Sequence, residues 1–306
     1  MKVLIVGLGS IARKHITAIK QLTENAEFFA WRFSRDSPTF ENVINLFSED
    51  EVKEHTFDFA IISNPTSEHK NSLSKLLDLK IPLFIEKPLF EKIGEEEKEI
   101  VQRIEALKIP SYVACNLRFL ECIQFIKKEI QGKRINEVNI YCGTYLPNWR
   151  PAEDFRKSYS ANKHLGGGVH IDLIHELDYT YWLFGAPVKT DSQFSHSSSL
   201  NISAFDYANY RWQYEGFTAN VILNYYRKDS KRSLEIVCEH GTYHVDLLKN
   251  EVSFMEEKIF SSSQNILDTY QSQMDFFLKY TLMGNDLNFN TAAEAYEILN
   301  LCLHQS

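Results

Sequence analysis

Two short segments of this sequence carry side chains that could move a proton and stabilise charge on an oxygen. Lys87 follows an apolar run in "IEKPL", and His175 lies between Asp172 and Asp178 in "DLIHELD". A lysine can stabilise a developing alkoxide, and a histidine is well matched to take a hydroxyl proton near neutral pH. The residues alone leave two interpretations of the second segment: a catalytic histidine, or an interior histidine with Asp172 as a helix-entry acid.

The glycines at 166–168 and Gly185 bracket a short predicted helix. Residues three and four apart share a helix face, which predicts a titratable row of Asp172, His175, Asp178 and Tyr179 and an apolar row of Leu173, Ile174, Leu177 and Tyr181. Glycines before such a row permit close approach of a ligand or of another backbone segment.

The elements around Lys87 predict a doubly wound parallel sheet. Apolar runs at 2–7, 27–33, 57–63, 81–86 and 111–116 alternate with helical patterns at 10–22, 67–79 and 95–107. From about Arg118 onwards, longer strands with alternating character predict one antiparallel sheet with hairpin turns at Gly216 and Gly241. Two helical patterns, 268–284 and 291–304, end the chain. We therefore predict an α/β protein with domains at 1–118 and 119–306.

The motif "GLGSIA" follows the first strand and opens a helix. Gly7 suits a tight turn, Gly9 lets the backbone approach a pyrophosphate, and the helix beginning at Ser10 and Ile11 presents its amides to the phosphates. Its strand–turn–helix context predicts dinucleotide binding.

Other cofactor contacts are expected at the carboxyl ends of the neighbouring strands. The second strand ends in Arg32, Ser34 and Arg35 before any acid, which favours NADP over NAD; the alternative is that the arginines are solvated strand-end charges. The segments "SNPTSEH" and "EKP" add the candidates Asn64, Pro65, Thr66, His69, Glu86 and Lys87, with a structural role for His69 as the alternative.

Composition narrows the class of partner and compartment. The formal net charge of −8 disfavours nucleic acid and anionic membranes, and the N-terminus does not have the pattern of a signal peptide. Five cysteines without a C-x-x-C spacing indicate reduced thiols in a cytoplasmic protein. Cys238, His240 and His244 could suggest a metal site, but their alternation favours a hairpin, so no metal is expected.

Taken together in this order, "GLGSIA", "NPTSEH", "EKP", "NLRF" and "GGGVHIDLIHELD" resemble the Gfo/Idh/MocA family of nicotinamide-dependent sugar oxidoreductases. The resemblance spans nearly the whole chain. It implies an N-terminal Rossmann domain and a C-terminal α/β domain with an open, mainly antiparallel sheet. It also implies a homodimer or homotetramer, and a last helix that packs back on the N-terminal domain.

The resemblance also implies roles for single residues. His175 in H-x-x-D would be the acid/base and Lys87 would steady the substrate oxygen. Family members commonly have a catalytic aspartate four residues before the histidine; here that position is Ile171, and Asp172 is only three before. Either Asp172 serves as the catalytic acid from a slightly rotated position, or this chain has lost that role. Further residues expected either to line the substrate pocket or to pack at a domain interface are Asn116, Arg118, Trp149, Arg150, Tyr159 and Asp178.

The expected function is hydride transfer between the nicotinamide and a secondary alcohol or ketone of a sugar or sugar derivative. One alternative is an NAD-assisted glycosidase, which would form product without net accumulation of reduced cofactor. The other is a non-catalytic nucleotide-binding regulator or scaffold, because a fold alone does not determine a function.

Overall fold

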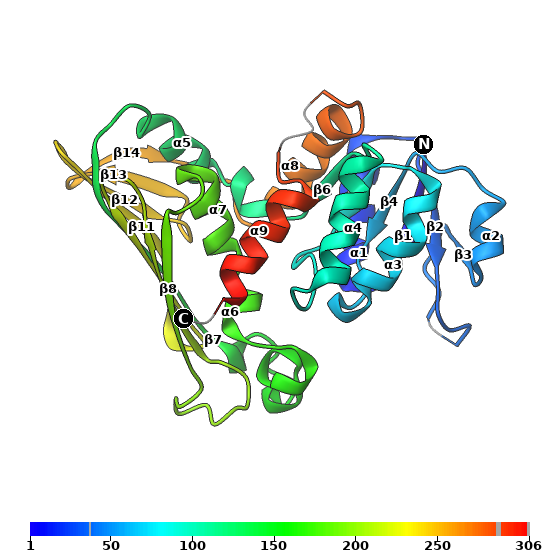
Figure 1. The fold of residues 1–306 in the computed structure, drawn as a ribbon, viewed down its shortest axis with the longest axis horizontal. Coiled ribbons are helices and arrows are strands. Elements are labelled where there is room, and N and C mark those ends of the chain that lie inside the picture. The colour runs from blue at the N-terminus through cyan, green and yellow to red at the C-terminus, as the bar shows by residue number, and fades with distance from the viewer. Residues whose placement is uncertain (37, 286–288, 305–306) are drawn as a thin grey trace. The chain divides into compact units, whose positions relative to one another are not determined.

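A computed structural model describes residues 1–36, 38–285 and 289–304. The chain divides into two units: unit 1 contains residues 1–115 and 270–299, and unit 2 contains residues 116–269 and the segment from residue 300 onwards. The architecture is α/β, with one sheet in each unit (Figure 1).

Unit 1 contains a six-stranded, all-parallel sheet in the order β3-β2-β1-β4-β5-β6. Its strands are β1 (Lys2–Val6), β2 (Glu27–Trp31), β3 (Val43–Leu46), β4 (Phe59–Ile62), β5 (Leu83–Ile85) and β6 (Ser111–Val113). Strands β1, β4 and β5 are almost wholly buried, as continuous apolar runs require when helices cover both faces of a sheet. The four-residue strand β3 was not predicted.

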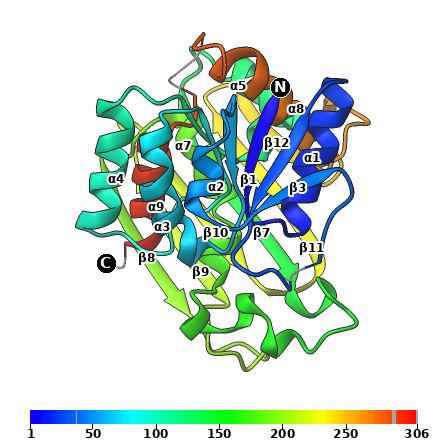
Figure 2. The same ribbon diagram turned by 90° about the vertical axis from the view of Figure 1, so that its right-hand side faces the viewer.

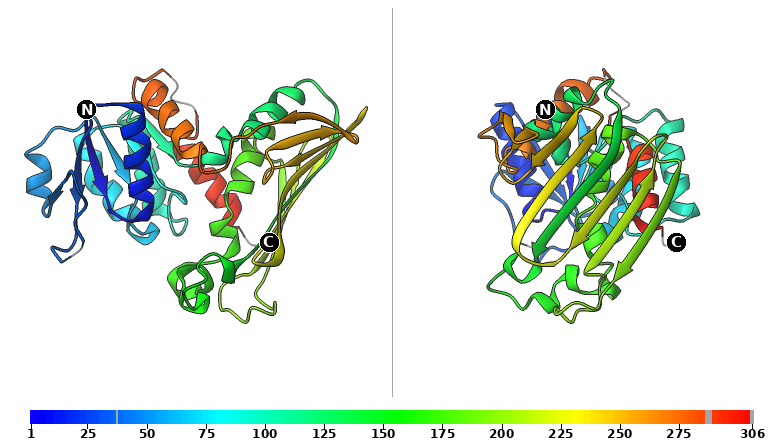
Figure 3. Two further views of the ribbon diagram at one scale, coloured as in Figure 1. Left: turned by 180° about the vertical axis from the view of Figure 1, so that it is seen from behind. Right: turned by 90° about the vertical axis from the view of Figure 1, so that its left-hand side faces the viewer.

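The helices of unit 1 are α1 (Ser10–Leu22), α2 (Glu49–Lys53), α3 (His69–Leu76), α4 (Glu95–Ala106), α8 (Thr269–Phe276) and most of α9 (Ala292–Leu303). α1 lies on one face of the sheet, and α3 and α4 lie on the other (Figures 1 and 3). The returning segment binds the edge strand β6, because the Asn290 side-chain amide donates to the Val113 carbonyl and the Val113 N–H donates to the Asn290 backbone carbonyl.

Unit 2 contains an eight-stranded sheet in the order β14-β13-β12-β11-β7-β10-β9-β8. Its strands are β7 (Ile135–Tyr145), β8 (Lys189–Ser195), β9 (Tyr207–Gln213), β10 (Thr218–Asn224), β11 (Tyr226–Cys238), β12 (Gly241–Asp246), β13 (Glu251–Phe254) and β14 (Glu257–Ser261). The predicted hairpins at Gly216 and Gly241 are confirmed. The prediction of an open, mainly antiparallel sheet is confirmed, since β10 and β7 pair in parallel and the other neighbouring strands of this sheet pair antiparallel.

The helices α5 (Glu121–Glu129), α6 (Val169–Asp172) and α7 (His175–Phe184) lie against one face of this sheet (Figure 1). Inward-facing residues such as Val138, Val221 and Leu234 are fully buried beneath them. Looking onto the other face, the strands stand in front and α7 lies behind them (Figure 3, right). Along the described part of the chain, no helix is long and apolar enough to cross a membrane.

Candidate active site

The two central strands of the unit 1 sheet end in the loops that carry the predicted dinucleotide motif. β1 and β4 are parallel neighbours at the point where the strand order reverses, which is where ligands bind in such sheets (Figure 2). Gly7 follows β1 with a φ of +85°, and a Cβ on it would lie 2.4 Å from the Cα of Asn64. Gly7 is therefore required for the close approach of these two loops.

Gly9 has a different role from Gly7. A Cβ built on Gly9 meets nothing within 4 Å, so the space before α1 is open at this position. No side chain caps the N-terminus of α1, and its first turn, which begins at Ser10 and Ile11, holds no acid. Uncapped amides at the positive end of a helix dipole fit the pyrophosphate of a dinucleotide.

The loop after β4 is hydrogen-bonded to the glycine loop. The Ser63 hydroxyl donates to the Gly7 carbonyl at 2.8 Å, and the Asn64 side-chain amide donates to the Ser72 hydroxyl at 2.8 Å. Pro65 is exposed and Thr66 begins a short 3-10 turn. Because Ser63 and Asn64 are bound internally, Pro65 and Thr66 are the residues of this loop that remain available to a cofactor.

Lys87 comes two residues after the end of β5, next to β4. The Glu86 side chain binds other residues of unit 1. One of its carboxylate oxygens lies 2.5 Å from Nε2 of His15 on α1, and the other accepts the Lys87 backbone N–H at 3.2 Å. Sequence reasoning missed His15, although a histidine on the apolar face of an amphipathic helix was a usable signal.

Two of the predicted cofactor contacts are turned into the protein. Arg32 is 8% exposed, and its guanidinium donates to the Pro38 carbonyl and to the Asn45 side chain. His69 is buried, with Nδ1 3.1 Å from the Leu89 carbonyl and Nε2 3.1 Å from the Asn64 carbonyl. In this structure both side chains hold loops together, and a direct cofactor contact for either one stays a prediction.

Ser34 and Arg35 remain on the surface beyond β2. The Ser34 hydroxyl accepts the backbone N–H of Asp36 at 3.2 Å, and the Arg35 guanidinium stacks 4.5 Å from the centre of the Phe47 ring. Stacking fixes the plane of a guanidinium and leaves its edge for an anion.

In unit 2 the predicted single helix is broken. α6 ends at Asp172, Leu173 and Ile174 interrupt it, and α7 begins at His175. The continuous titratable row predicted from one helix is therefore wrong.

The glycines before α6 allow two segments of backbone to pass close to each other. A Cβ on Gly167 would lie 2.0 Å from the Tyr159 carbonyl oxygen, and Gly168 has a φ of +150°. Side chains at these positions would clash with the 159–161 turn or be strained.

Asp172 and the exposed aromatic residues gather around Tyr225, a residue that sequence reasoning missed. The buried Tyr225 hydroxyl donates to the Asp172 carboxylate, and burial, followed by the Asp172 charge, raises the pKa of Tyr225 well above its ordinary value. Trp149 packs edge-on against the Tyr225 ring at 5.5 Å. The Tyr159 hydroxyl donates to the Gly166 carbonyl at 3.0 Å. This cluster combines one carboxylate with aromatic faces.

Three other predicted pocket residues are internal. Arg118 is fully buried and binds Asp178 through two hydrogen bonds of 2.8 and 2.7 Å, so these two residues pair with each other rather than line a pocket. Asn116 is also buried and donates to the Thr269 hydroxyl at 2.6 Å. Arg150 is exposed and lies 3.5 Å from Glu153.

A second buried ion pair also anchors α7. Glu176, which follows His175, accepts hydrogen bonds of 2.6 and 3.1 Å from Arg232 on β11. Burial alone would lower the pKa of Arg232, but the facing carboxylate raises it above its usual range. No periodicity connects positions 176 and 232, so the sequence carried no signal for this pair.

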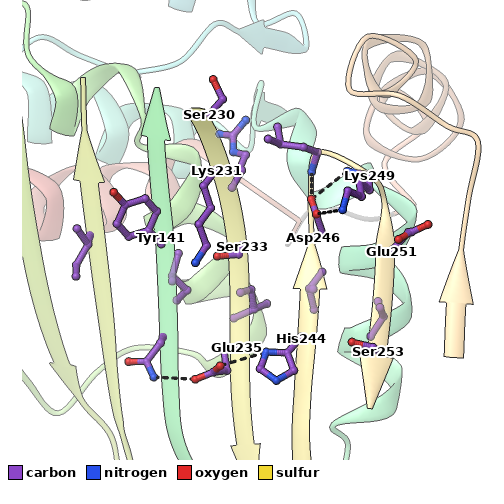
Figure 4. Close-up of a pocket in the computed structure, with 18 of the residues that line it drawn as sticks. Tyr141, Ser230, Lys231, Ser233, Glu235, His244, Asp246, Lys249, Glu251 and Ser253 are labelled. Atoms are coloured by element: carbon purple, nitrogen blue, oxygen red, sulfur yellow. Dashed lines mark hydrogen bonds and ion pairs between the residues drawn. The ribbon is translucent and has the colours of Figure 1, made fainter. Parts of the chain in front are cut away.

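A surface depression with a volume of about 720 Å³ lies on the helix-free face of the unit 2 sheet (Figure 4). Several of its charged residues pair with one another, as in His244–Glu235 at 3.1 Å and Lys258–Glu251 at 2.6 Å. It is separated from α7 by the sheet, so it is a different feature from the candidate site. Within the described ranges, no group of three His, Cys, Asp or Glu residues could hold a metal ion.

Known proteins resemble this chain along most of its length. Residues 1–109 match the NAD-binding Rossmann fold of the Gfo/Idh/MocA oxidoreductase family, and residues 123–244 match the family's C-terminal domain. A scyllo-inositol 2-dehydrogenase (NAD(+)) of Bacillus subtilis is 30% identical over 52% of this chain and 44% of the relative. A glucose-6-phosphate 3-dehydrogenase of the same organism is 25% identical over 62% of this chain and 56% of the relative. The chain thus spans about half the length of these curated relatives.

A solved structure shares the fold over the whole chain. The scyllo-inositol dehydrogenase from Lactobacillus casei, with bound NAD(H) and scyllo-inositol, aligns with a TM-score of 0.79 and 20% identity, and the alignment covers 100% of this chain and 95% of that one. Together with the two domain matches, this fold shows that the chain belongs to the Gfo/Idh/MocA family of oxidoreductases.

Proposed function

We propose that this chain is a dinucleotide-dependent oxidoreductase that moves a hydride between nicotinamide and a secondary alcohol or ketone of a sugar or cyclic polyol. The observation that carries the proposal lies in unit 1. Lys87 follows β5 and the Gly7–Gly9 loop follows β1, so both lie at the carboxyl edge of one parallel sheet, in which β4 separates the two strands. A cation at this edge suits a substrate oxygen held beside a bound dinucleotide.

The chain's own residues would divide the proton chemistry. Nicotinamide, when bound, supplies the hydride acceptor or donor. His175 takes the hydroxyl proton as the C–O double bond forms, and Lys87 donates a hydrogen bond to that oxygen. Asp172, oriented by Tyr225, binds a neighbouring hydroxyl of the substrate. In reduction, His175 returns the proton to the oxygen.

The substrate class follows from the cluster of Asp172, Tyr225 and Trp149. Aromatic faces pack against the C–H faces of a ring, whereas a carboxylate accepts hydrogen bonds from ring hydroxyls. The named activities of the two curated relatives are also oxidations of hydroxyls on six-membered rings.

For the cofactor, we propose a preference for NADP over NAD. Its support is that Ser34 and the stacked Arg35 follow β2 where an acid would otherwise bind ribose hydroxyls. Titration with NADPH and NADH tests this: Arg35→Ala should weaken NADPH binding and leave NADH binding unchanged. Equal weakening of both, or tighter NADH binding by the unmodified protein, would contradict the preference.

The catalytic assignment is tested by single substitutions with matched controls. Lys87→Ala and His175→Ala should each lower the rate of hydride transfer by about a hundredfold or more on inositols and hexoses. The controls Lys92→Ala and His240→Ala alter exposed residues and should keep full turnover. A protein that binds the dinucleotide but turns over none of these substrates would favour a regulator.

The remaining expectations concern assembly and compartment. All five cysteines are buried and none forms a disulfide, which supports a reducing, cytoplasmic location. We also propose a homodimer or homotetramer, with a small molecule as the main partner and neither nucleic acid nor membrane. Light scattering at micromolar concentration would give the mass of the assembly, and a monomer would contradict that proposal.

A further inference from the structure

We infer that two buried histidines, His15 and His69, position Lys87 by tying the peptide on either side of it to the two loops of the candidate dinucleotide site. The inference rests on the proposed function, because it concerns the geometry of Lys87 relative to the cofactor. It gives a task to two buried side chains that the proposed chemistry does not use.

The first connection runs from α1 to the residue before Lys87. His15 is fully buried and packs edge-on against Phe84 at 4.8 Å. Its Nε2 lies 2.5 Å from Glu86, and the other oxygen of that carboxylate accepts the Lys87 backbone N–H. Nδ1 of His15 is buried and has no hydrogen-bond partner among the described residues. A neutral ring that donates from Nε2 to the Glu86 carboxylate leaves no buried N–H unpaired.

The second connection runs from the loop after β4 to the residues beyond Lys87. His69 begins α3 and is 1% exposed. Its ring lies between the Asn64 carbonyl, in the loop that approaches Gly7, and the Leu89 carbonyl. Burial lowers the pKa of His69, which favours a neutral ring with a single N–H that donates to one of these carbonyls at a time.

Residues 86–89 therefore contact a buried histidine at each end. α1 begins at the glycine loop, and α3 follows the Asn64–Thr66 turn, so each histidine belongs to an element that directly follows a predicted cofactor-binding loop. Hydrogen bonds away from water hold such a segment to a narrow range of positions, and misplacement of a reacting group by about 1 Å can cost about a hundredfold in rate. These histidines are positioning residues, since neither is proposed to contact the substrate.

Hydrogen exchange tests the inference without a substrate. His15→Phe and His69→Phe keep an aromatic ring but remove the hydrogen bonds, so both should speed amide exchange in the peptide that spans residues 83–93. His55→Phe is the matched control, because His55 packs 4.9 Å from Phe29 in the same unit and has no contact with residues 86–89 among those described. Unchanged exchange in both histidine variants would overturn the inference.

Rates of hydride transfer test whether the histidines act through Lys87. His15→Phe should slow single-turnover transfer by about tenfold or more and change NADPH affinity by less than about threefold. His15→Gln can still donate to Glu86 and should restore most of the rate. Adding His15→Phe to Lys87→Ala should have little further effect, whereas an equal loss in that background would reveal a general structural defect and overturn the inference. If the unmodified protein transfers no hydride, the proposed function fails, and the exchange experiment alone decides the positioning role.

Discussion

The two units hold their candidate catalytic residues in different ways. In unit 1, Lys87 follows β5, and the residues on either side of it are bound through two histidines and one carboxylate. In unit 2, His175 begins a helix whose next residues, Glu176 and Asp178, each form a buried pair with an arginine. A loop needs contacts to its own peptide, whereas a helix is rigid and needs only to be fixed to its neighbours. The loop that carries Lys87 is therefore held by hydrogen bonds to its own backbone, whereas the helix that carries His175 is held by ion pairs between side chains.

The largest expected effect comes from breaking an ion pair of α7. Arg118→Met leaves the Asp178 carboxylate buried without its partner, which should lower the free energy of unfolding by about 3–5 kcal/mol. Urea unfolding followed by tryptophan fluorescence reports this, since Trp149, Trp182 and Trp212 all lie in unit 2. Removing both charges with Arg118→Met and Asp178→Leu should recover much of the loss. A single variant as stable as the parent would contradict anchoring by charge.

The stability of the folded protein should depend on pH through a buried histidine of unit 2. Burial lowers the pKa of His170 to about 4, below its value in an unfolded chain. The unfolded state therefore binds a proton first as pH falls, so stability should be lost between about pH 6.5 and 4, by roughly 3 kcal/mol in total. His170→Phe should flatten this part of the pH profile. The same slope in both proteins would assign it to other groups.

The two motif glycines should separate folding from binding in unit 1. Gly7→Ala combines a positive φ with a clash against the Asn64 backbone, and should cost about 1–3 kcal/mol of stability. Gly9→Ala meets open space, so it should fold normally and weaken only dinucleotide binding. Thermal unfolding with and without NADPH distinguishes the two. Equal destabilisation by both would show that Gly9 is also constrained by packing.

The smallest expected effect comes from changing the residue that orients the Asp172 carboxylate. Tyr225→Phe removes one hydroxyl that donates to Asp172, which should cost about 1–2 kcal/mol of stability or less. Because Asp172 would lose this orienting hydrogen bond, KM for the polyol should rise more than kcat falls. A fall in kcat alone, with KM unchanged, would assign Tyr225 to the chemical step instead.

Much of unit 1 could be predicted because its motifs are local. The strand, the turn and the helix of "VGLGSIA" follow one another directly, and the parallel sheet brings β1, β4 and β5 to one edge without further information. His15 and His69 were the exceptions. Whether a histidine near that edge faces a ligand or the Leu89 carbonyl depends on packing between elements that are distant in sequence.

Unit 2 was harder to predict because its decisive contacts are long-range. The sequence by itself determined the α/β class, the parallel nucleotide-binding sheet, the hairpins at Gly216 and Gly241, and the family. Only the tertiary structure decided that α6 and α7 are separate helices. It also decided that Arg118 pairs with Asp178 and that Arg232 pairs with Glu176. Periodicity reports which face of an element is apolar, but the partner of a buried charge is set by which distant segment the fold brings opposite it.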